Sequence, residues 1–425
     1  MAGSAAALAL ARRGHEVHLF EAVAEPEPVG AGVLLQPTGL EVLRRLGLAE
    51  AMLALGARVD TLFGDTPSGR PVLDMRYARL STAAKTAFEA AFGVGAQRGA
   101  LMGLLWQALR ESAVHWHCGT AVTGFEQPAS GGTVMLQRQP SPPGALATPP
   151  VESRPFDLLL LANGTFSRLR RQMRVRQSER LFPWGALWCL LPEPADWPRT
   201  LLRQRYRLAR EMIGLMPVGT AFSANGHGTM AVVPTAPDQG RRVTLFWSQC
   251  AADLQAWTEA PDLAVLKRTM TTLLPAAEPL LDSLTDPAQL RVARYADVWM
   301  QQWHDGAVVA IGDAGHGMSP QLGQGANMGL IDAWVMAEAV DEAAAAGAPW
   351  SSAAAAYTRR RRAHLRYYQQ ASRALTPLFQ SHRAAGPWLR DLFFGIGGKL
   401  PFIESQSVQT LCGVKAGWLG GRFRL

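Results

Sequence analysis

The chain has 425 residues, of which 48% are hydrophobic and 18% charged, and its formal net charge is +8. This composition predicts a folded protein of two or three domains and excludes a largely disordered chain. Scattered arginines carry the charge without interleaved aromatic residues, and the apolar runs are far shorter than the roughly 20 residues of a membrane span, so we predict neither a nucleic-acid partner nor a membrane segment.

The chain begins with an Ala- and Leu-rich stretch that has the pattern of a buried helix followed by a strand. Residues 4–13 fit the helix, Gly14 fits its C-cap, and residues 16–20 fit a strand that ends at Glu21. Because the positive residues follow the apolar run instead of preceding it, this stretch is not a secretory signal.

Two further helices are predicted in the first quarter of the chain. A turn-rich loop over residues 25–33 leads to a helix over 38–48, and a second amphipathic helix runs from about residue 98 to 112. His115 and His117 then alternate on one side of a predicted strand. No carboxylate lies within three residues of either histidine, so we predict no metal site there.

The middle of the chain changes from a buried parallel-type strand to an antiparallel pattern. Residues 156–162 form the apolar strand and lead into a turn, whereas 185–191, 229–233 and 242–248 alternate as strands of a second sheet. Seven of the 13 tryptophans fall between Trp184 and Trp303, where they either line an apolar pocket or pack in the core. For each tryptophan taken singly, core packing is favoured.

The most informative segment spans residues 307–327. A short apolar strand at 307–311 is followed by Asp313, an irregular turn that contains Pro320 and Gly323, and a helix that begins near Ala326. Glycines at a helix N-terminus let backbone N–H groups approach a ligand closely. Together with the positive end of the helix dipole, those groups suit a pyrophosphate or the electron-rich edge of a reduced flavin ring.

The spacing Gly-Asp-Ala-x-His-x-x-x-Pro-x-x-Gly-Gln-Gly-x-Asn, which starts at Gly312 and is followed by Asp332, resembles the second flavin-binding motif of the FAD-dependent aromatic hydroxylases. These are the para-hydroxybenzoate hydroxylase-type, group A flavoprotein monooxygenases. The resemblance implies an α/β fold: a Rossmann-like, three-layer FAD-binding domain with a parallel sheet, an inserted antiparallel β-sheet substrate domain and C-terminal helices. It implies cofactor contacts at Gly312, Asp313, Pro320, Gly323, Gln324, Gly325, Ala326 and Asn327. His316 within the motif is either a catalytic base or a structural histidine near the flavin, and we favour the structural role.

The same resemblance assigns five residues elsewhere to the cofactor. Gly3 matches the third glycine of the dinucleotide fingerprint, Glu21 the acceptor of the ribose hydroxyls, and Arg98 an arginine beside the flavin. Asn163 and Gly164 match the family's Asp-Gly motif, which is associated with both FAD and NAD(P)H. Asn163 departs from the family aspartate, and the loss of its negative charge puts reduction by the nicotinamide cofactor in doubt.

The first strand and the first two glycines of the fingerprint do not precede Gly3. Either the start at Met1 is an internal methionine of a longer reading frame, or the protein has no phosphate turn and binds FAD poorly. We favour the first explanation, since a parallel sheet without its central strand exposes unpaired backbone.

The implied reaction is the hydroxylation of an aromatic or conjugated small molecule with NAD(P)H and O₂, through a flavin C4a-hydroperoxide. It requires no catalytic side chain and no metal. Two alternatives remain: a reductase or dehydrogenase of the same fold, and a degenerate, non-catalytic flavin-binding protein. A flavin halogenase is less favoured because its Trp-x-Trp-x-Ile-Pro signature is absent.

The predicted domains are discontinuous. The FAD-binding domain takes residues 1–70, 95–175 and 285–345, the substrate domain takes 71–94 and 176–284, and the C-terminal helical region takes 346–425. Four widely spaced cysteines without a Cys-x-x-Cys pair favour the cytosol. The sequence indicates neither the substrate, nor the preferred nicotinamide cofactor, nor the oligomeric state.

Overall fold

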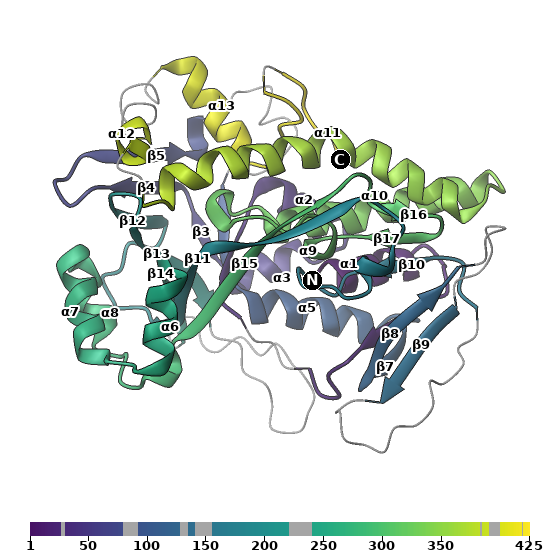
Figure 1. Ribbon diagram of the computed structural model, residues 1–425, viewed down its shortest axis with the longest axis horizontal. Helices are drawn as coiled ribbons and strands as arrows, with labels where there is room; N and C mark the ends of the chain where they lie inside the picture. Colours follow the sequence, from purple (N-terminus) through teal and green to yellow (C-terminus); the bar gives the residue numbers. More distant parts are fainter. Residues whose placement is uncertain are drawn as a thin grey trace.

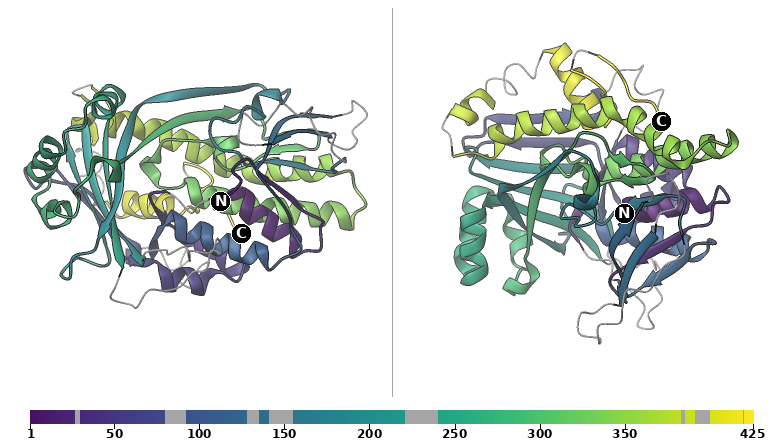
Figure 2. Two further views of the ribbon diagram at one scale, coloured as in Figure 1. Left: turned by 90° about the horizontal axis from the view of Figure 1, so that it is seen from below. Right: turned by 45° about the vertical axis from the view of Figure 1, so that its right-hand side comes forward.

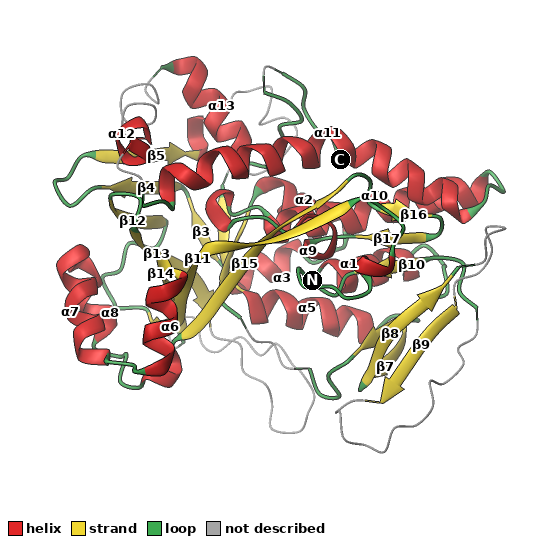
Figure 3. Cartoon of the chain, in the orientation of Figure 1, coloured by secondary structure: helices red, strands yellow, loops and turns green. Residues whose placement is uncertain are grey.

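The computed structural model describes residues 1–26, 30–79, 92–127, 135–140, 155–220, 240–382, 385–390, 400–418 and 420–425. These residues form a mixed α/β molecule, as predicted, with parallel strand pairs at one end and a large, mostly antiparallel sheet at the other (Figures 1 and 3). Among the described residues, no helix combines the length and the apolar character that a membrane span requires.

The parallel strands form two small sheets. β1 (His18–Glu21) pairs with β7 (His115–Cys118), and β10 (Leu159–Leu161) pairs with β17 (Val308–Ala310). β16 (His304–Asp305) adds an antiparallel strand to β17. The predicted strands over 16–20, 156–162 and 307–311 are thus present, with ends that differ by one to three residues.

Three helices cover these sheets. α1 (Ala2–Ala11) packs against both α5 (Arg98–Arg110) and α10 (Gly325–Ala345). The small side chains of α1 permit a close approach to the strands, because a Cβ on Gly3 would lie 2.9 Å from the Cβ of Ala162. Gly14, with φ +85°, follows the end of α1, as the C-cap pattern predicts.

A small antiparallel sheet separates this region from the large sheet. Its strand order is β2 (Gly32–Leu35), β6 (Gly93–Gln97) and β3 (Ala57–Val59). α2 (Pro37–Arg45) and α3 (Ala49–Leu55) connect its strands, and β8 (Thr120–Glu126) with β9 (Met135–Pro140) forms a separate ribbon.

The large sheet has seven strands in the order β15 (Arg291–Met300), β11 (Gln177–Pro192), β14 (Arg241–Cys250), β13 (Glu211–Thr220), β12 (Leu201–Arg207), β4 (Thr61–Asp65) and β5 (Pro71–Arg76). The predicted strands 185–191 and 242–248 lie in β11 and β14, whereas 229–233 lies outside the described residues. Both β4 and β15 fall outside the ranges predicted for the substrate domain. The domain boundaries therefore stay a prediction.

Helices α6 (Ala251–Glu259), α7 (Leu263–Leu273) and α8 (Glu278–Leu281) cover one face of this sheet and share a core with it (Figure 1). Trp247 is part of this core, and Trp197 and Trp257 pack against it. These three tryptophans therefore serve packing. Short 3₁₀ turns complete the order: η1 (Tyr77–Arg79), η2 (Arg170–Gln172), η3 (Pro275–Ala277), η4 (Pro287–Gln289) and η5 (Pro320–Leu322).

The longest helix, α11 (Trp350–Phe379), runs along the molecule from the small parallel sheets toward the large sheet (Figures 1 and 2). Its Gln369 donates to the carbonyl of Val298 at 2.9 Å, and the hydroxyl of Ser372 lies 2.9 Å from that of Ser319. α12 (Ala385–Arg390) and α13 (Pro401–Leu411) follow, and α13 packs near β5. One helix thus contacts segments of both halves of the fold.

Candidate functional site

The loop after β17 makes a sharp turn at Gly312. Its φ of +57° is a conformation that side chains disfavour, and a Cβ there would lie 2.8 Å from the Cβ of Ala2. A short helix, α9 (Asp313–His316), follows directly. The predicted irregular turn therefore consists of this helical turn and of η5, which begins at Pro320.

The second half of the motif forms the start of α10. Gly323 has φ +60°, and no atom lies within 4 Å of a Cβ built on it, so space is open there. The first N–H groups of α10 have no partner within the helix, because a helix leaves its first turn of donors unpaired. A Cβ on Gly325 would lie 3.6 Å from Oδ1 of Asp313, which places that exposed carboxylate beside Gly325 at the start of α10.

Two polar residues of the motif are buried and hold α10 in place. The side chain of Asn327 accepts from the N–H of Gln36 at 2.8 Å and donates to the carbonyl of Leu34 at 3.0 Å. Gln324 donates to the carbonyl of Leu411 at 2.6 Å, and its Oε1 has no hydrogen-bond partner among the described residues. The side chain of Asn327 therefore joins α10 to the end of β2. Only its backbone N–H, which belongs to the first turn of α10, is left for a ligand at the helix N-terminus.

Asp332 on α10 holds the loop between β17 and α10 in place. Its fully buried carboxylate accepts from the N–H of Gly312 at 2.8 Å, from Nε2 of His316 at 2.5 Å and from Nε of Arg361 at 2.8 Å. Burial opposes ionisation, but the charges of His316 and Arg361 and the three hydrogen bonds hold the pKa of Asp332 well below its usual range. His316, predicted to be structural, is buried and makes this contact.

Asn163 and Gly164 lie in the loop after β10, beside the loop after β17. Asn163 is exposed, and Gly164 has φ +84° with no atom within 4 Å of an added Cβ. The buried guanidinium of Arg170 joins the two loops, because its Nη1 donates to the carbonyls of Thr165 and Ala314, each at 2.8 Å. Our sequence analysis assigned no role to Arg170, although the Ser-x-x-Arg spacing with Ser167 is its signal: the Ser167 hydroxyl accepts from the N–H of Arg170 at 3.0 Å.

Glu21 and Arg98 converge on the same region from two other elements. Glu21 ends β1 and accepts from the N–H of Val23 at 2.9 Å, and Arg98 begins α5 with its side chain exposed. The amino group of Met1 reports their proximity. Its pKa is lowered to about 6, chiefly by burial and then by the charge of Arg98, while the charges of Asp313 and Glu21 act to raise it.

The residues present fit the shape and charge of a dinucleotide. The open space at Gly164 and Gly323, the donors of the α10 start and the carboxylates of Glu21 and Asp313 lie at the ends of β1, β10 and β17. In parallel sheets, ligands bind beyond the carboxyl ends of the strands, and helix N-termini favour negative groups. The structure therefore places these residues beyond the carboxyl ends of strands from two parallel pairs, β1–β7 and β10–β17.

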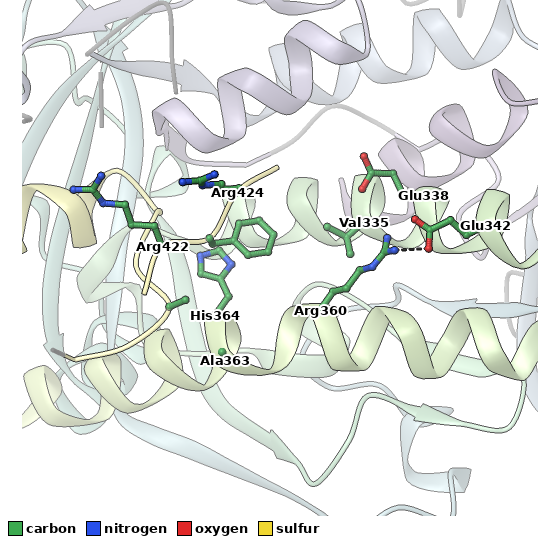
Figure 4. A pocket seen from close by; sticks show the side chains of 10 residues that line it. Val335, Glu338, Glu342, Arg360, Ala363, His364, Arg422 and Arg424 are labelled. Atoms are coloured by element: carbon green, nitrogen blue, oxygen red, sulfur yellow. Dashed lines mark hydrogen bonds and ion pairs between the residues drawn. The ribbon is translucent and has the colours of Figure 1, made fainter. Parts of the chain in front are cut away.

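A separate groove is lined by residues of α10, α11 and the C-terminal segment (Figure 4). Figure 4 shows Arg360 directed toward Glu342, with which it forms an ion pair, and shows Arg422 and Arg424 on the C-terminal segment. None of the residues predicted to bind the cofactor lines this groove.

Comparisons with known proteins agree with this geometry. Residues 1–372 match the family described as FAD binding domain. Kynurenine 3-monooxygenase of Salinispora arenicola is 29% identical over 372 residues, which cover 84% of this chain and 75% of that protein. The 2-heptyl-3-hydroxy-4(1H)-quinolone synthase of Mycobacteroides abscessus is 26% identical over 350 residues, 80% of each chain.

Among solved structures, HpxO of Klebsiella pneumoniae in complex with FAD and uric acid covers 99% of this chain and 95% of its own. Its TM-score is 0.73 at 19% identity, a likeness that shows the fold. The predicted fold class is confirmed.

Proposed function

The chain belongs to the FAD binding domain family, and on this premise we propose that its site uses NAD(P)H and O₂ to hydroxylate an aromatic or conjugated small molecule. It is an FAD-dependent oxidoreductase of the monooxygenase type, so the predicted family, cofactor and enzyme class are confirmed. The observation that carries the proposal is that the Asp313 carboxylate lies beside the N-terminus of α10, where the space around Gly323 is open.

Bound FAD, once reduced by NAD(P)H, supplies the activation of O₂ and the transfer of one oxygen atom to the substrate. The chain supplies position and charge. We assign the N–H groups of Gly325 and Ala326 to the electron-rich edge of the flavin ring, Asp313 to a ribityl hydroxyl, and Glu21 to the ribose of the adenosine half. Arg98 and Pro320 flank the ring in this assignment, and Gly3, Gly164, Gly312, Gly323 and Gln324 shape the cavity.

The substrate is assigned to the space between the start of α10 and the large sheet. The hydroxyl of Thr244 on β14 lies 3.4 Å from the N–H of Gly32, and Gln97 donates to the carbonyl of Thr220 at 2.5 Å. A Cβ on Gly95 would lie 2.0 Å from the carbonyl oxygen of Pro217. These contacts join the small antiparallel sheet to the large sheet and so close one side of the proposed substrate space. Closure excludes water, which would otherwise break down an activated oxygen species before it reacts with the substrate.

The test is spectroscopic. The chain is purified, its flavin absorption is recorded with and without added FAD, and NADPH is then added in air with a panel of aromatic acids, quinolones and purines. We expect flavin bands that bleach on NADPH, and substrate-dependent O₂ uptake with a hydroxylated product. A chain that binds no FAD under any of these conditions contradicts the proposal.

Two alternatives are separated by the same assay. A reductase of this fold oxidises NADPH without incorporating oxygen into an organic product, and a degenerate protein holds FAD without oxidising NADPH. The second is favoured by one observation, the exposed Asn163 in place of the family's aspartate.

We also propose a reducing, cytosolic location. Its support is that Cys118, Cys189, Cys250 and Cys412 are all free thiols, as expected where thiols are kept reduced.

A further inference from the structure

The strand pair β1–β7 brings together histidines that are far apart in the sequence. His18 lies opposite His115, and Phe20 lies opposite His117, while the N–H of His115 donates to the carbonyl of Val17 at 2.8 Å. Side chains alternate between the faces of a strand, so the two partners of each register pair project on the same side. The three imidazoles therefore gather on one face.

Glu16 adds a carboxylate from the segment that leads into β1. It precedes His18 by two residues and so reaches the same face. Its Oε1 lies 3.1 Å from Nε2 of His18 and 3.8 Å from Nε2 of His115. The three ligand atoms all lie within 4.8 Å of one another.

We propose that Glu16, His18 and His115 form a binding site for a divalent transition-metal ion of the Zn²⁺ class. Metal–ligand bonds of about 2.0–2.2 Å in a tetrahedral site place ligand atoms about 3.3–3.6 Å apart. The two distances from Glu16 lie on either side of this value. Two imidazoles and one carboxylate are a set that suits Zn²⁺, Co²⁺ or Ni²⁺ better than Mg²⁺ or Ca²⁺, which prefer oxygen ligands.

His117 completes the site as the partner of a ligand. Its Nε2 lies 2.9 Å from Nδ1 of His18. When His18 binds an ion through Nε2, its proton resides on Nδ1 and is donated to His117, which fixes the tautomer and the orientation of the ring. Metal-bound histidines almost always have such a second partner.

Packing fixes one ring and leaves the other free to adjust. Phe156 meets the edge of His18 at 5.3 Å. His115 stacks on His18 with centroids 4.6 Å apart and an interplanar angle of 24°, so its ring has to turn for both Nε2 atoms to bind one ion. The side chain of His18 is only 12% exposed, whereas those of Glu16 and His115 are 57% and 56% exposed. An ion can therefore enter from solvent and keep one position for water.

An ion at this site would join β1 to β7 three residues before Glu21. Among the described residues these strands form a sheet of their own, without further neighbours. The expected effect of the ion is therefore a higher temperature of unfolding that depends on its concentration, because a ligand that binds only the folded state stabilises it.

The test is a calorimetric titration of the full chain with Zn²⁺, after removal of metal by a chelator and in a buffer that does not bind metal. We expect one ion per chain. His115→Ala and Glu16→Gln should each weaken binding by about 100-fold, and His117→Ala by about 10- to 100-fold. Co²⁺ bound to the same site should give the visible difference bands of a tetrahedral complex.

The matched control is Cys118→Ser, which removes a metal-binding thiol from the next position on β7, where the side chain faces the opposite side of the strand. It should leave the affinity unchanged, as should His382→Ala at an exposed histidine elsewhere. Absence of binding in the unaltered chain overturns the proposal. Unchanged affinity in His115→Ala and Glu16→Gln also overturns it, as does loss of binding in Cys118→Ser alone.

Discussion

At the residue scale, the site depends on a single buried carboxylate. Asp332 accepts three hydrogen bonds, from the loop that carries Asp313, from His316 and from the long helix α11. A buried charge is costly unless it is paired, so each of these partners also depends on Asp332. The carboxylate thereby sets the position of the loop through buried contacts within the protein.

We expect Asp332→Asn to lower the free energy of unfolding by about 3 kcal/mol, because it leaves the buried Arg361 without its counter-charge. The control is Glu342→Gln on the same helix, which removes an exposed ion pair with Arg360 and should cost about 0.5 kcal/mol. Denaturant titrations measure both. Equal effects of the two substitutions would contradict a structural role for the buried pair.

The same carboxylate makes stability depend on pH. Its pKa is lower in the folded chain than the value of about 3.9 in an unfolded one, so the unfolded state binds more protons as the pH falls. The stabilisation is complete above about pH 4 and is lost below it. Asp332→Asn should reduce this loss of stability at low pH, measured as the free energy of unfolding against pH. An unchanged loss in the variant would show that other groups cause it.

Asn163 permits a test of the nicotinamide step. Restoring the family residue with Asn163→Asp should speed the reduction of bound flavin by NADPH up to about tenfold, since a charge-assisted hydrogen bond is roughly twice as strong as a neutral one. Anaerobic stopped-flow absorbance measures the rate. Asn163→Ala, which supplies no charge, should not speed it; an equal gain in both variants would refute the electrostatic explanation.

At the scale of elements, the two ends of α10 offer a matched comparison. Gly323 before the helix and Gly347 after it have φ of +60° and +59°, and no atom lies within 4 Å of a Cβ built on either. Replacement by alanine therefore imposes the same backbone strain at both, about 1–2 kcal/mol. Only the first lies at the proposed flavin edge.

Gly323→Ala should raise the dissociation constant of FAD about tenfold, while Gly347→Ala leaves it near the unaltered value. Fluorescence titration with FAD measures the constants, and thermal unfolding verifies that both variants lose similar stability. If Gly347→Ala weakens FAD binding as much, the effect comes from the stability of the helix and not from its N-terminus.

Elements built from local patterns were accessible to sequence reasoning. The apolar run before Gly312, the glycines before α10 and the Ala-rich α1 each follow from spacing within about 20 residues. The Ser-x-x-Arg spacing marks Arg170 in the sequence, but its contact with the carbonyl of Ala314 could not be predicted, because it depends on which strands become neighbours. The approach of the Glu16 carboxylate to His115 could not be predicted for the same reason. The helical turn at residues 313–316 was also not predicted, because contacts from Asp332 and Trp303, outside the loop, hold it in place.

At the scale of the whole molecule, β6 of the small antiparallel sheet lies in close contact with β13 of the large sheet. Gly95 on β6 leaves no space for a methyl group, because its Cβ would meet the carbonyl oxygen of Pro217 at 2.0 Å. Gly95→Ala should therefore move the two sheets apart and cost about 1–3 kcal/mol of stability.

The functional consequence is leakage of water into the space assigned to the substrate. We expect Gly95→Ala to release more hydrogen peroxide per NADPH oxidised, measured by a peroxidase-coupled assay with substrate present. Gly420→Ala, where a Cβ meets no atom within 4 Å, is the control and should not change this ratio. An unaltered ratio in Gly95→Ala would mean that this contact does not seal the site.

The course of α11 bears on how the molecule loses its structure. Its Gln369 contacts the end of β15, Ser372 contacts the loop before α10, and Gln380 directly after it donates to Ser248 on β14 at 2.8 Å. Neither half of the fold can melt without breaking contacts to this shared helix. Heating should accordingly produce one calorimetric transition, with the two halves melting as a single cooperative unit.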